Sequence, residues 1–203
     1  MSVRPHVVLR EGDREDAAAL ISLWRDCAGD GESGNRANTS ALWREPGVAE
    51  AAAALDQNFG DGYRRMVVAL VEGEIVGAIC FQIITLTPIN LTKVLLVTEL
   101  QVAPASRRQS VASTLLSAAA NVGEEANCEV VLTISPASAR EPNRFLAKLG
   151  FGQVSIIRGA QATMLRSKLS TKATNSKDTG KLIAVRRTMR RRQVESRRLR
   201  QRQ

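Results

Sequence analysis

The segment from residue 97 to residue 116 holds the side chains best suited to chemistry. An apolar run is followed by a proline turn, then by Arg107 and Arg108, and residues of helical character begin at Ala112. The first N–H groups of a helix have no partner within it and lie at the positive end of its dipole, so they can bind phosphate oxygens. The two arginines would add charge-assisted hydrogen bonds. The segment therefore predicts a strand, a basic turn and a helix that together hold a diphosphate.

Two motifs resemble hallmarks of the GNAT superfamily of N-acetyltransferases. The pattern Pro104-x-x-Arg107-x-x-Ser110-x-Ala112 is similar to its acyl-CoA diphosphate loop, although Ser110 stands where glycine is usual. Further along, the sequence from Phe145 to Phe151 resembles the second hallmark, a helix that ends in Leu-Gly-Phe. Alone, the first motif fits any basic turn and the second fits a helix C-cap. In this order they predict the fold over residues 6–168.

The resemblance implies an α+β fold, in which a single mixed, mostly antiparallel sheet is flanked by helices and acetyl-CoA is the acyl donor. It also implies that the strands near 94–102 and 130–134 separate into a V-shaped gap for the pantetheine arm, and a β-bulge is the usual cause of such a separation. A backbone N–H near residues 100–102 would polarise the thioester carbonyl. The donor-binding residues that it implies are Leu100, Gln101, Val102, Arg107, Arg108, Gln109, Ser110, Val111, Ala112 and Ser113.

Glu99 is the candidate catalytic base. An amine must lose a proton to attack a thioester, and Glu99 is an acid within an otherwise apolar strand, where burial would raise its pKa. The alternative is that Glu99 lies on the solvated face of the strand or pairs with an arginine, because Leu100 and Val102 alternate with it and are expected to face the core. His6 is expected to be an ordinary surface residue.

Two positions depart from the pattern of the resembling family. The tyrosine that commonly protonates the departing thiolate is replaced by Leu146, and the asparagine common at the start of the same helix aligns with Ala139. Asn143 is in a different register, and Ser135 and Ser138 are partial substitutes. Because water can assist the departing thiolate, loss of the tyrosine predicts slower transfer rather than none.

Hydrophobic periodicity predicts the elements that position these residues. Strands are expected at 7–10, 66–71, 75–84, 94–102 and 130–134, and a closing hairpin at 152–158 and 162–168. Asp13 is expected to cap the first helix, and further helices are expected at 50–58, 112–122 and 142–149. Residues 29–40 are typical of an exposed loop. In the resembling family this first helix–loop–helix region lines the acceptor site and varies most, so the acceptor stays unspecified.

Basic residues are concentrated at the C-terminus. The chain has 203 residues and a net charge of +9, yet residues 171–203 hold 12 Lys and Arg against 2 acids, so the remainder carries −1. This asymmetry predicts a domain at 1–169, a flexible linker at 170–180 and a basic tail at 181–203. Arginine predominates in the tail, which favours planar phosphate or base contacts. The expected nucleic-acid-binding residues are Arg186, Arg187, Arg190, Arg191, Arg192, Arg197 and Arg198.

Two functions are compatible with these observations. The first is an N-acetyltransferase that moves an acetyl group from acetyl-CoA to a primary amine, of a protein or a small molecule, by direct attack in a ternary complex. The second is a catalytically weak or inactive module of the same fold that binds RNA or the ribosome through the tail. A solvated tail with only nonspecific affinity is the simpler alternative for that segment. Both a monomer and a homodimer are compatible with the sequence.

Cysteine usage and hydropathy favour a cytoplasmic protein without a metal site or membrane association. Cys27, Cys80 and Cys128 are odd in number and far apart, with no CxxC pattern and no nearby histidine, so reduced thiols are expected. The N-terminal residues contain no extended apolar region typical of a leader. No window of about 18 uninterrupted apolar residues occurs, as a spanning helix would require.

Overall fold

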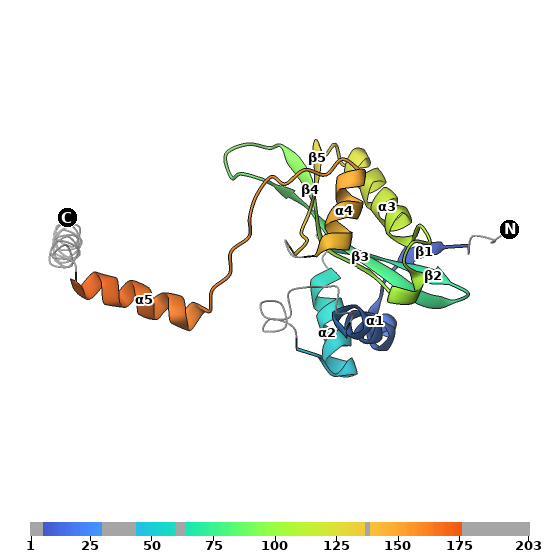
Figure 1. Ribbon diagram of the computed structural model, residues 1–203, viewed down its shortest axis with the longest axis horizontal. Helices are drawn as coiled ribbons and strands as arrows, with labels where there is room; N and C mark the ends of the chain where they lie inside the picture. The colour runs from blue at the N-terminus through green and yellow to red at the C-terminus, as the bar shows by residue number, and fades with distance from the viewer. Residues whose placement is uncertain (1–5, 30–43, 60–63, 137–138, 176–203) are drawn as a thin grey trace, which may run out of the picture. The chain divides into compact units, whose positions relative to one another are not determined.

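The computed structural model describes residues 6–29, 44–59, 64–136 and 139–175, and the chain divides into two compact units, 1–152 and 153–203 (Figure 1). The strands of the first unit are β1 (Val8–Glu11), β2 (Arg64–Val71), β3 (Glu74–Thr85), β4 (Lys93–Val102) and β5 (Val130–Thr133). Its α-helices are α1 (Ala17–Gly29), α2 (Val48–Phe59), α3 (Val111–Glu125) and α4 (Arg140–Lys148). The second unit contains α5 (Ala162–Asn175).

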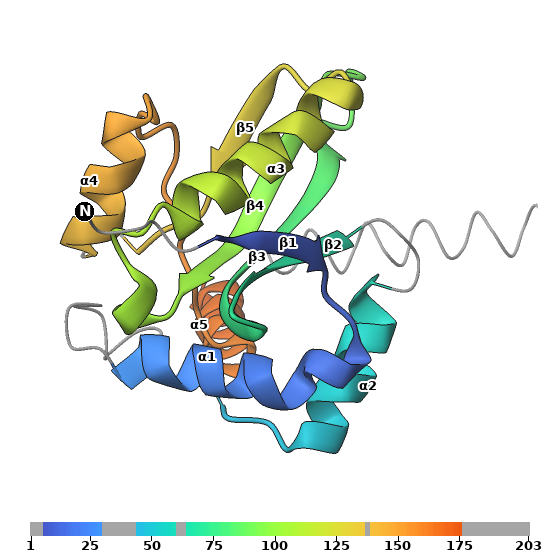
Figure 2. The same ribbon diagram turned by 90° about the vertical axis from the view of Figure 1, so that its right-hand side faces the viewer.

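The sheet of the first unit has the order β1-β2-β3-β4-β5. The first four strands pair antiparallel, and β5 pairs parallel to β4. Figure 2 shows α1 and α2 on one side of the sheet and α3 and α4 on the other. These features confirm the predicted mixed, mostly antiparallel sheet flanked by helices.

Local sequence signals account for two of the connections. Glu72 and Gly73 join β2 to β3 with φ values of 52° and 87°, as a two-residue hairpin turn requires. Ahead of α1, the Asp13 carboxylate accepts a hydrogen bond from the Glu15 N–H at 2.7 Å, which confirms the predicted cap. Asp16 completes a capping box by accepting from the Asp13 N–H at 3.0 Å.

Each face of the sheet has its own apolar cluster. On the α3 side, Phe81, Leu95 and Val97 pack in one cluster with Leu115, Leu116 and Ala119 of α3. On the α1 and α2 side, the cluster contains Leu20, Leu23, Cys27, Met66, Val68, Ala78 and Cys80. The sheet therefore separates two layers of helices.

Gly77 of β3 lets the start of α3 lie close to the sheet. A Cβ atom at this position would lie 2.9 Å from Cγ1 of Val111 and 3.1 Å from the carbonyl oxygen of Gln101. Both neighbours belong to the region predicted to bind the acyl donor. The absence of a side chain at Gly77 thus allows the first residue of α3 to pack directly on β3, next to β4.

The predicted closing hairpin is wrong. The structure has no regular secondary structure at 153–161, and α5 covers the second predicted strand. The helix is rich in Ala, Leu, Met, Lys and Arg, residues with good helix propensity. Val154, Ile156 and Ile157 are all exposed, so they do not form the buried face that a strand of the sheet would need. The first six residues of the predicted linker, 170–175, lie in α5, and the rest lies outside the described residues.

Candidate active site

A β-bulge at Thr98 changes the direction of the side chains of β4. Across the β3–β4 ladder Phe81 pairs with Val97 whereas Cys80 pairs with Glu99, so Thr98 is an extra residue on β4. Residues paired directly across a ladder share a face of the sheet. Because Cys80 packs on the α1 and α2 side, the bulge directs Glu99 to that side as well.

The pairing of β4 with β5 ends at the bulge. The parallel ladder runs from Val94 and Val130 to Val97 and Thr133, and the Ile134 N–H donates to the Val97 carbonyl at 3.1 Å. In the described part of the chain β4 makes no later pair with β5, although it continues to Val102. Beyond Val97, β4 therefore continues without β5 as a partner, as the expected V-shaped gap requires.

Two residues of β4, Leu100 and Val102, direct their backbone groups toward this open edge. The Ala103 N–H donates to the Val76 carbonyl of the neighbouring segment at 2.9 Å, and backbone groups alternate between the two sides of a strand. Leu100 and Val102 therefore direct their N–H and C=O groups away from β3, while those of Gln101 point toward it. The contact of Cys27 Sγ with the Val102 carbonyl, at 3.4 Å, agrees with this direction.

The segment after β4 is shaped for an anion. A short 3-10 turn at Pro104–Ser106 leads to residues 107–110, and α3 begins at Val111. The first bond of the helix joins the Thr114 N–H to the Ser110 carbonyl at 2.9 Å. The N–H groups of residues 111–113 thus precede the first bond of the helix and have no partner within it, which is the arrangement that binds phosphate oxygens.

The two arginines of this segment have different surroundings. Arg107 is half-buried and lowers the pKa of the Cys27 thiol, although burial of that thiol raises its pKa by more. Arg108 is exposed, and its Nη2 atom lies 2.9 Å from Oε1 of Glu141 on α4. Exposed ion pairs contribute little to stability, so a phosphate can replace Glu141 at low cost.

Glu99 is exposed to solvent, which matches the alternative of a solvated strand face and not the burial expected for a catalytic base. The pKa of Glu99 is nevertheless raised. Desolvation of the carboxylate by the surrounding protein raises the pKa by more than the hydrogen bond from Gln101 lowers it. That bond joins Gln101 Nε2 to Glu99 Oε2 at 3.0 Å. Among the described residues, the side chain that hydrogen-bonds this carboxylate is therefore an amide and not an arginine.

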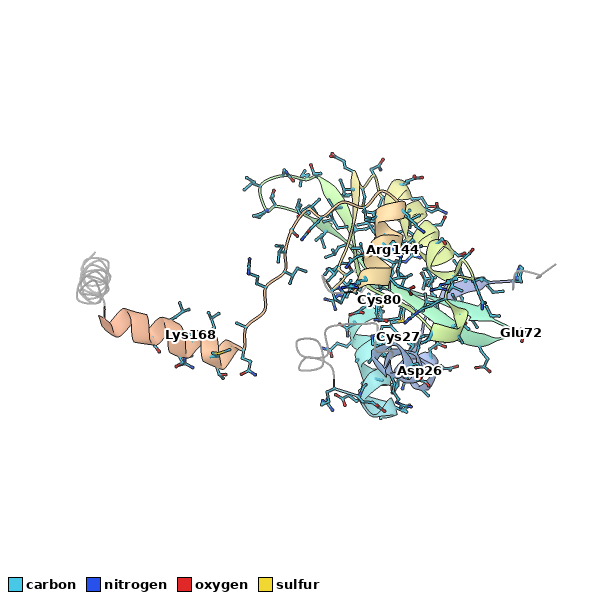
Figure 3. All side chains as sticks on the ribbon, viewed as in Figure 1. Asp26, Cys27, Glu72, Cys80, Arg144 and Lys168 are labelled. Carbon is cyan, nitrogen blue, oxygen red and sulfur yellow. The ribbon has the colours of Figure 1, made fainter. Side chains whose placement is uncertain are left out.

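Cys80, labelled with Cys27 in Figure 3, lies opposite Glu99 but is not suited to be a nucleophile. Burial and the charge of Glu99 raise the pKa of its thiol to about 12, despite an opposite effect from Arg64. A nucleophilic cysteine must be a thiolate. At neutral pH Cys80 stays protonated, which argues against an acyl-cysteine intermediate.

The two positions that depart from the family pattern differ in their surroundings from the residues near them that could substitute. Leu146 and Ala139 are buried and belong to the packing of α4. Ser135 and Asn143 lie just beyond the point where β4 and β5 separate, and the Ser135 hydroxyl donates to Asn143 Oδ1 at 2.6 Å. Ser138 lies outside the described residues. His6 is exposed, as expected.

Ser110 has the backbone conformation that explains why glycine is usual there. Its φ is 66°, in the left-handed region that costs an ordinary residue about 1–2 kcal/mol. We expect Ser110→Gly to raise the free energy of unfolding by about 0.5–1 kcal/mol, after the flexibility of glycine is deducted. Thermal or urea unfolding measures the change. The control Ser117→Gly, at an exposed position inside α3, should lower stability instead; equal effects of the two would contradict the strain.

Sequence reasoning missed Arg64, Asn58 and Gln82, which lie on the same face as Glu99. Arg64 pairs with Gln82 across the β2–β3 ladder, and Asn58 comes from the end of α2. The missed signal is the period of two in β2, which places Arg64 on the face of Met66.

Two hollows of about 390 and 250 Å³ lie along α3 and not at Glu99. The described residues contain no group of three or more potential metal ligands. Within the same part of the chain, no helix combines the length and the apolar character needed to cross a membrane.

The geometry defines a class of protein, an acyltransferase fold in which an open strand edge lies beside the N-terminus of a helix. The chain belongs to the acetyltransferase (GNAT) family, whose sequence profile matches residues 21–151. No curated protein matches the chain by sequence.

Solved structures share this fold at low identity. A transcriptional regulator from Bacillus halodurans C-125 is 20% identical, with 77% of this chain and 99% of that chain covered and a TM-score of 0.63. The aminoglycoside N-acetyltransferase AAC(6')-Iy, in complex with CoA, is 14% identical over 79% and 97%, with a TM-score of 0.60. A ribosomal-protein-alanine N-acetyltransferase from Brucella melitensis biovar Abortus 2308 is 16% identical over 77% and 99%, with a TM-score of 0.58. Acetyl-CoA is the donor typical of the family.

Proposed function

We propose that the protein is an N-acetyltransferase that transfers the acetyl group of acetyl-CoA directly to a primary amine. The observation that carries this proposal is the coincidence of three features on β4. The strand loses its partner β5 after Val97, bulges at Thr98 and leads into the anion-binding start of α3. Acyl transfer from a CoA thioester uses each of these features. The open edge and the diphosphate site bind the donor, and the bulge orients Glu99 as a base for the attacking amine.

Each group has a defined part in the reaction. Residues 111–113, with Arg107 and Arg108, bind the diphosphate through backbone N–H groups and guanidinium groups. The N–H groups of Leu100 and Val102 line the open edge, where they bond to the pantetheine arm and polarise the thioester carbonyl. Glu99 accepts the proton of the attacking amine, directly or through water. The remaining predicted donor contacts, with Gln101 and Gln109, complete the same surface.

Calorimetric titration with acetyl-CoA tests the donor site before any acceptor is chosen. We expect the double substitution Arg107→Ala, Arg108→Ala to weaken binding by about 100-fold or more, since charge-assisted hydrogen bonds contribute roughly 1.5–3 kcal/mol each. Arg65→Ala is the control, because this guanidinium group pairs with Glu11 of β1 and belongs to no part of the proposed donor site. Equal affinity of the double variant and the native chain would remove the diphosphate site from the proposal.

A second candidate function rests on the C-terminal charge. Residues 171–203 carry 12 Lys and Arg against 2 acids, a composition that binds polyanions. The predicted RNA-binding arginines lie outside the described residues. In this function the acetyltransferase fold is a weakly active or inactive module that binds RNA or the ribosome through its tail.

A further inference from the structure

Arg64, at the start of β2, is held in place by neutral groups. Its Nε atom donates to Gln82 Oε1 at 3.2 Å, and its Nη1 atom donates to Asn58 Oδ1 at 3.0 Å. The Asn58 amide is itself fixed, because its Nδ2 atom donates to the Ala54 carbonyl at 2.8 Å. The guanidinium group is therefore oriented by two amide oxygens, and neither neutralises its charge.

Other arginines of the first unit differ in this respect. Carboxylates pair with Arg10, Arg14, Arg25, Arg44, Arg65 and Arg108. Among the described residues, no carboxylate lies within ion-pair distance of Arg64. An arginine has five N–H donors, so three on Nη1 and Nη2 remain after the two bonds to amides. Such a fixed and uncompensated fork matches a planar carboxylate in two-point contact.

Arg64 and Glu99 lie on one face of the sheet and on opposite sides of Cys80. Arg64 pairs with Gln82, and Cys80, two residues before Gln82 on β3, pairs with Glu99. A separation of two strands and two residues corresponds to about 12 Å between the Cα atoms of Arg64 and Glu99. Both charges reach the Cys80 thiol, because Arg64 lowers its pKa and Glu99 raises it. The two side chains thus flank the same part of this face, and the half-buried Gln82 amide next to Arg64 belongs to it as well.

We propose that the acceptor is an amine that also carries a carboxylate, which Arg64 binds while Glu99 takes the proton of the amine. This inference rests on the acetyltransferase activity proposed above and specifies its substrate class. The fixed cation selects against amines that carry only positive charge, because a second cation near Arg64 would be repelled. The preferred acceptor has its amine and carboxylate separated by a short chain, as the spacing of Arg64 and Glu99 requires.

The test compares two matched series of acceptors on the full chain. The ω-amino acids from glycine to 6-aminohexanoate are assayed against n-alkylamines of the same chain lengths, with acetyl-CoA and thiol release as the readout. We expect the native chain to prefer the amino acids. Arg64→Gln should reduce the ratio of kcat/KM for amino acids over alkylamines by about 10- to 100-fold, the range expected for a charge-assisted pair. Arg64→Lys, which keeps the charge but loses the fork, should give an intermediate ratio.

Arg65 supplies a matched control on the next residue. It lies on the opposite face of the sheet, where Nη2 is 2.6 Å from Oε1 of Glu11 and the guanidinium group is 5.8 Å from the Phe81 ring centroid. Arg65→Gln should leave the ratio unchanged. Melting temperatures of all variants show whether each is folded.

The outcomes separate this inference from the proposed function. An unchanged ratio in Arg64→Gln, or a preference for phosphoethanolamine over the amino acids, would overturn the carboxylate assignment while acetyl transfer stands. Failure of acetyl-CoA to bind in calorimetry would overturn the proposed function itself. If no amine in either series reacts, thermal unfolding decides: 4-aminobutyrate should stabilise the native chain but not Arg64→Gln, and the absence of that difference would reject the inference.

Discussion

Glu99→Gln should lower kcat by about 10²–10⁴-fold, the usual contribution of a general base. The amide keeps the size of the side chain and its bond to Gln101, but it cannot accept the proton of an attacking ammonium or water. Binding of acetyl-CoA should change by less than about twofold, because Glu99 faces the α1 and α2 side while the diphosphate site lies at the start of α3. Stopped assays of thiol release with a reactive amine measure the first quantity, and calorimetry the second.

The pH dependence of activity in the native chain also tests whether Glu99 is the base. The pKa of Glu99 is raised by desolvation, and the deprotonated carboxylate is the active base. Activity should therefore fall as the pH is lowered through a pKa above the ordinary value for a glutamate. Glu99→Gln should lack this acidic limb.

Glu74→Gln, a change of the same chemistry at the start of β3, is the control for charge. It should keep both kcat and the acidic limb. A native profile without a limb above the ordinary glutamate range, or an active Glu99→Gln, would show that water alone deprotonates the amine.

The donor site was predictable because its determinants are contiguous. Proline, two arginines and the first turn of a helix lie within a few residues of one another, and local rules place N–H groups at the helix start. Even the strain at Ser110 follows from its place in the loop. The V-shaped gap was available only through the family resemblance, since it depends on where two strands stop pairing.

The orientation of Glu99 illustrates what pairing adds. Counting by twos from Val97 places Glu99 on the α3 side, whereas counting from Leu100 places it on the other side. Only the bulge at Thr98 reconciles the two counts, and a bulge is specified by the partner strand as much as by β4 itself. The change of apolar phase between Val97 and Leu100 was the signal in the sequence.

In the region after α4, the sequence pattern predicted strands that the structure does not contain. Val154 and Ile156 alternate as in a strand, yet the structure places no strand there, and the next segment forms α5. Alternation predicts a strand only where a sheet edge and a buried face receive it. In 162–175 helix propensity prevails, and the segment forms α5.

Removal of residues 181–203 should abolish retention of the protein on RNA while leaving acetyl-CoA affinity unchanged. If 6–10 of the basic side chains contact phosphates, affinity of the full chain for RNA should fall about 10³- to 10⁵-fold between 50 and 200 mM salt, because bound counterions are released on association. Filter binding or fluorescence anisotropy with a labelled RNA, measured over a salt series, tests this dependence.

A variant that replaces the seven predicted arginines with glutamine is the matched control, since it keeps the length of the tail but removes most of its positive charge. It should lose RNA binding as the deletion does. Acetyl transfer to a free amine that survives the deletion would assign the tail to localisation and the folded unit to chemistry. Background turnover in both forms, together with RNA binding that depends on the tail, would instead favour the second candidate. The loss of the tyrosine at Leu146 already predicts slow transfer. RNA binding that is unaffected by the deletion would contradict the role of the tail in either function.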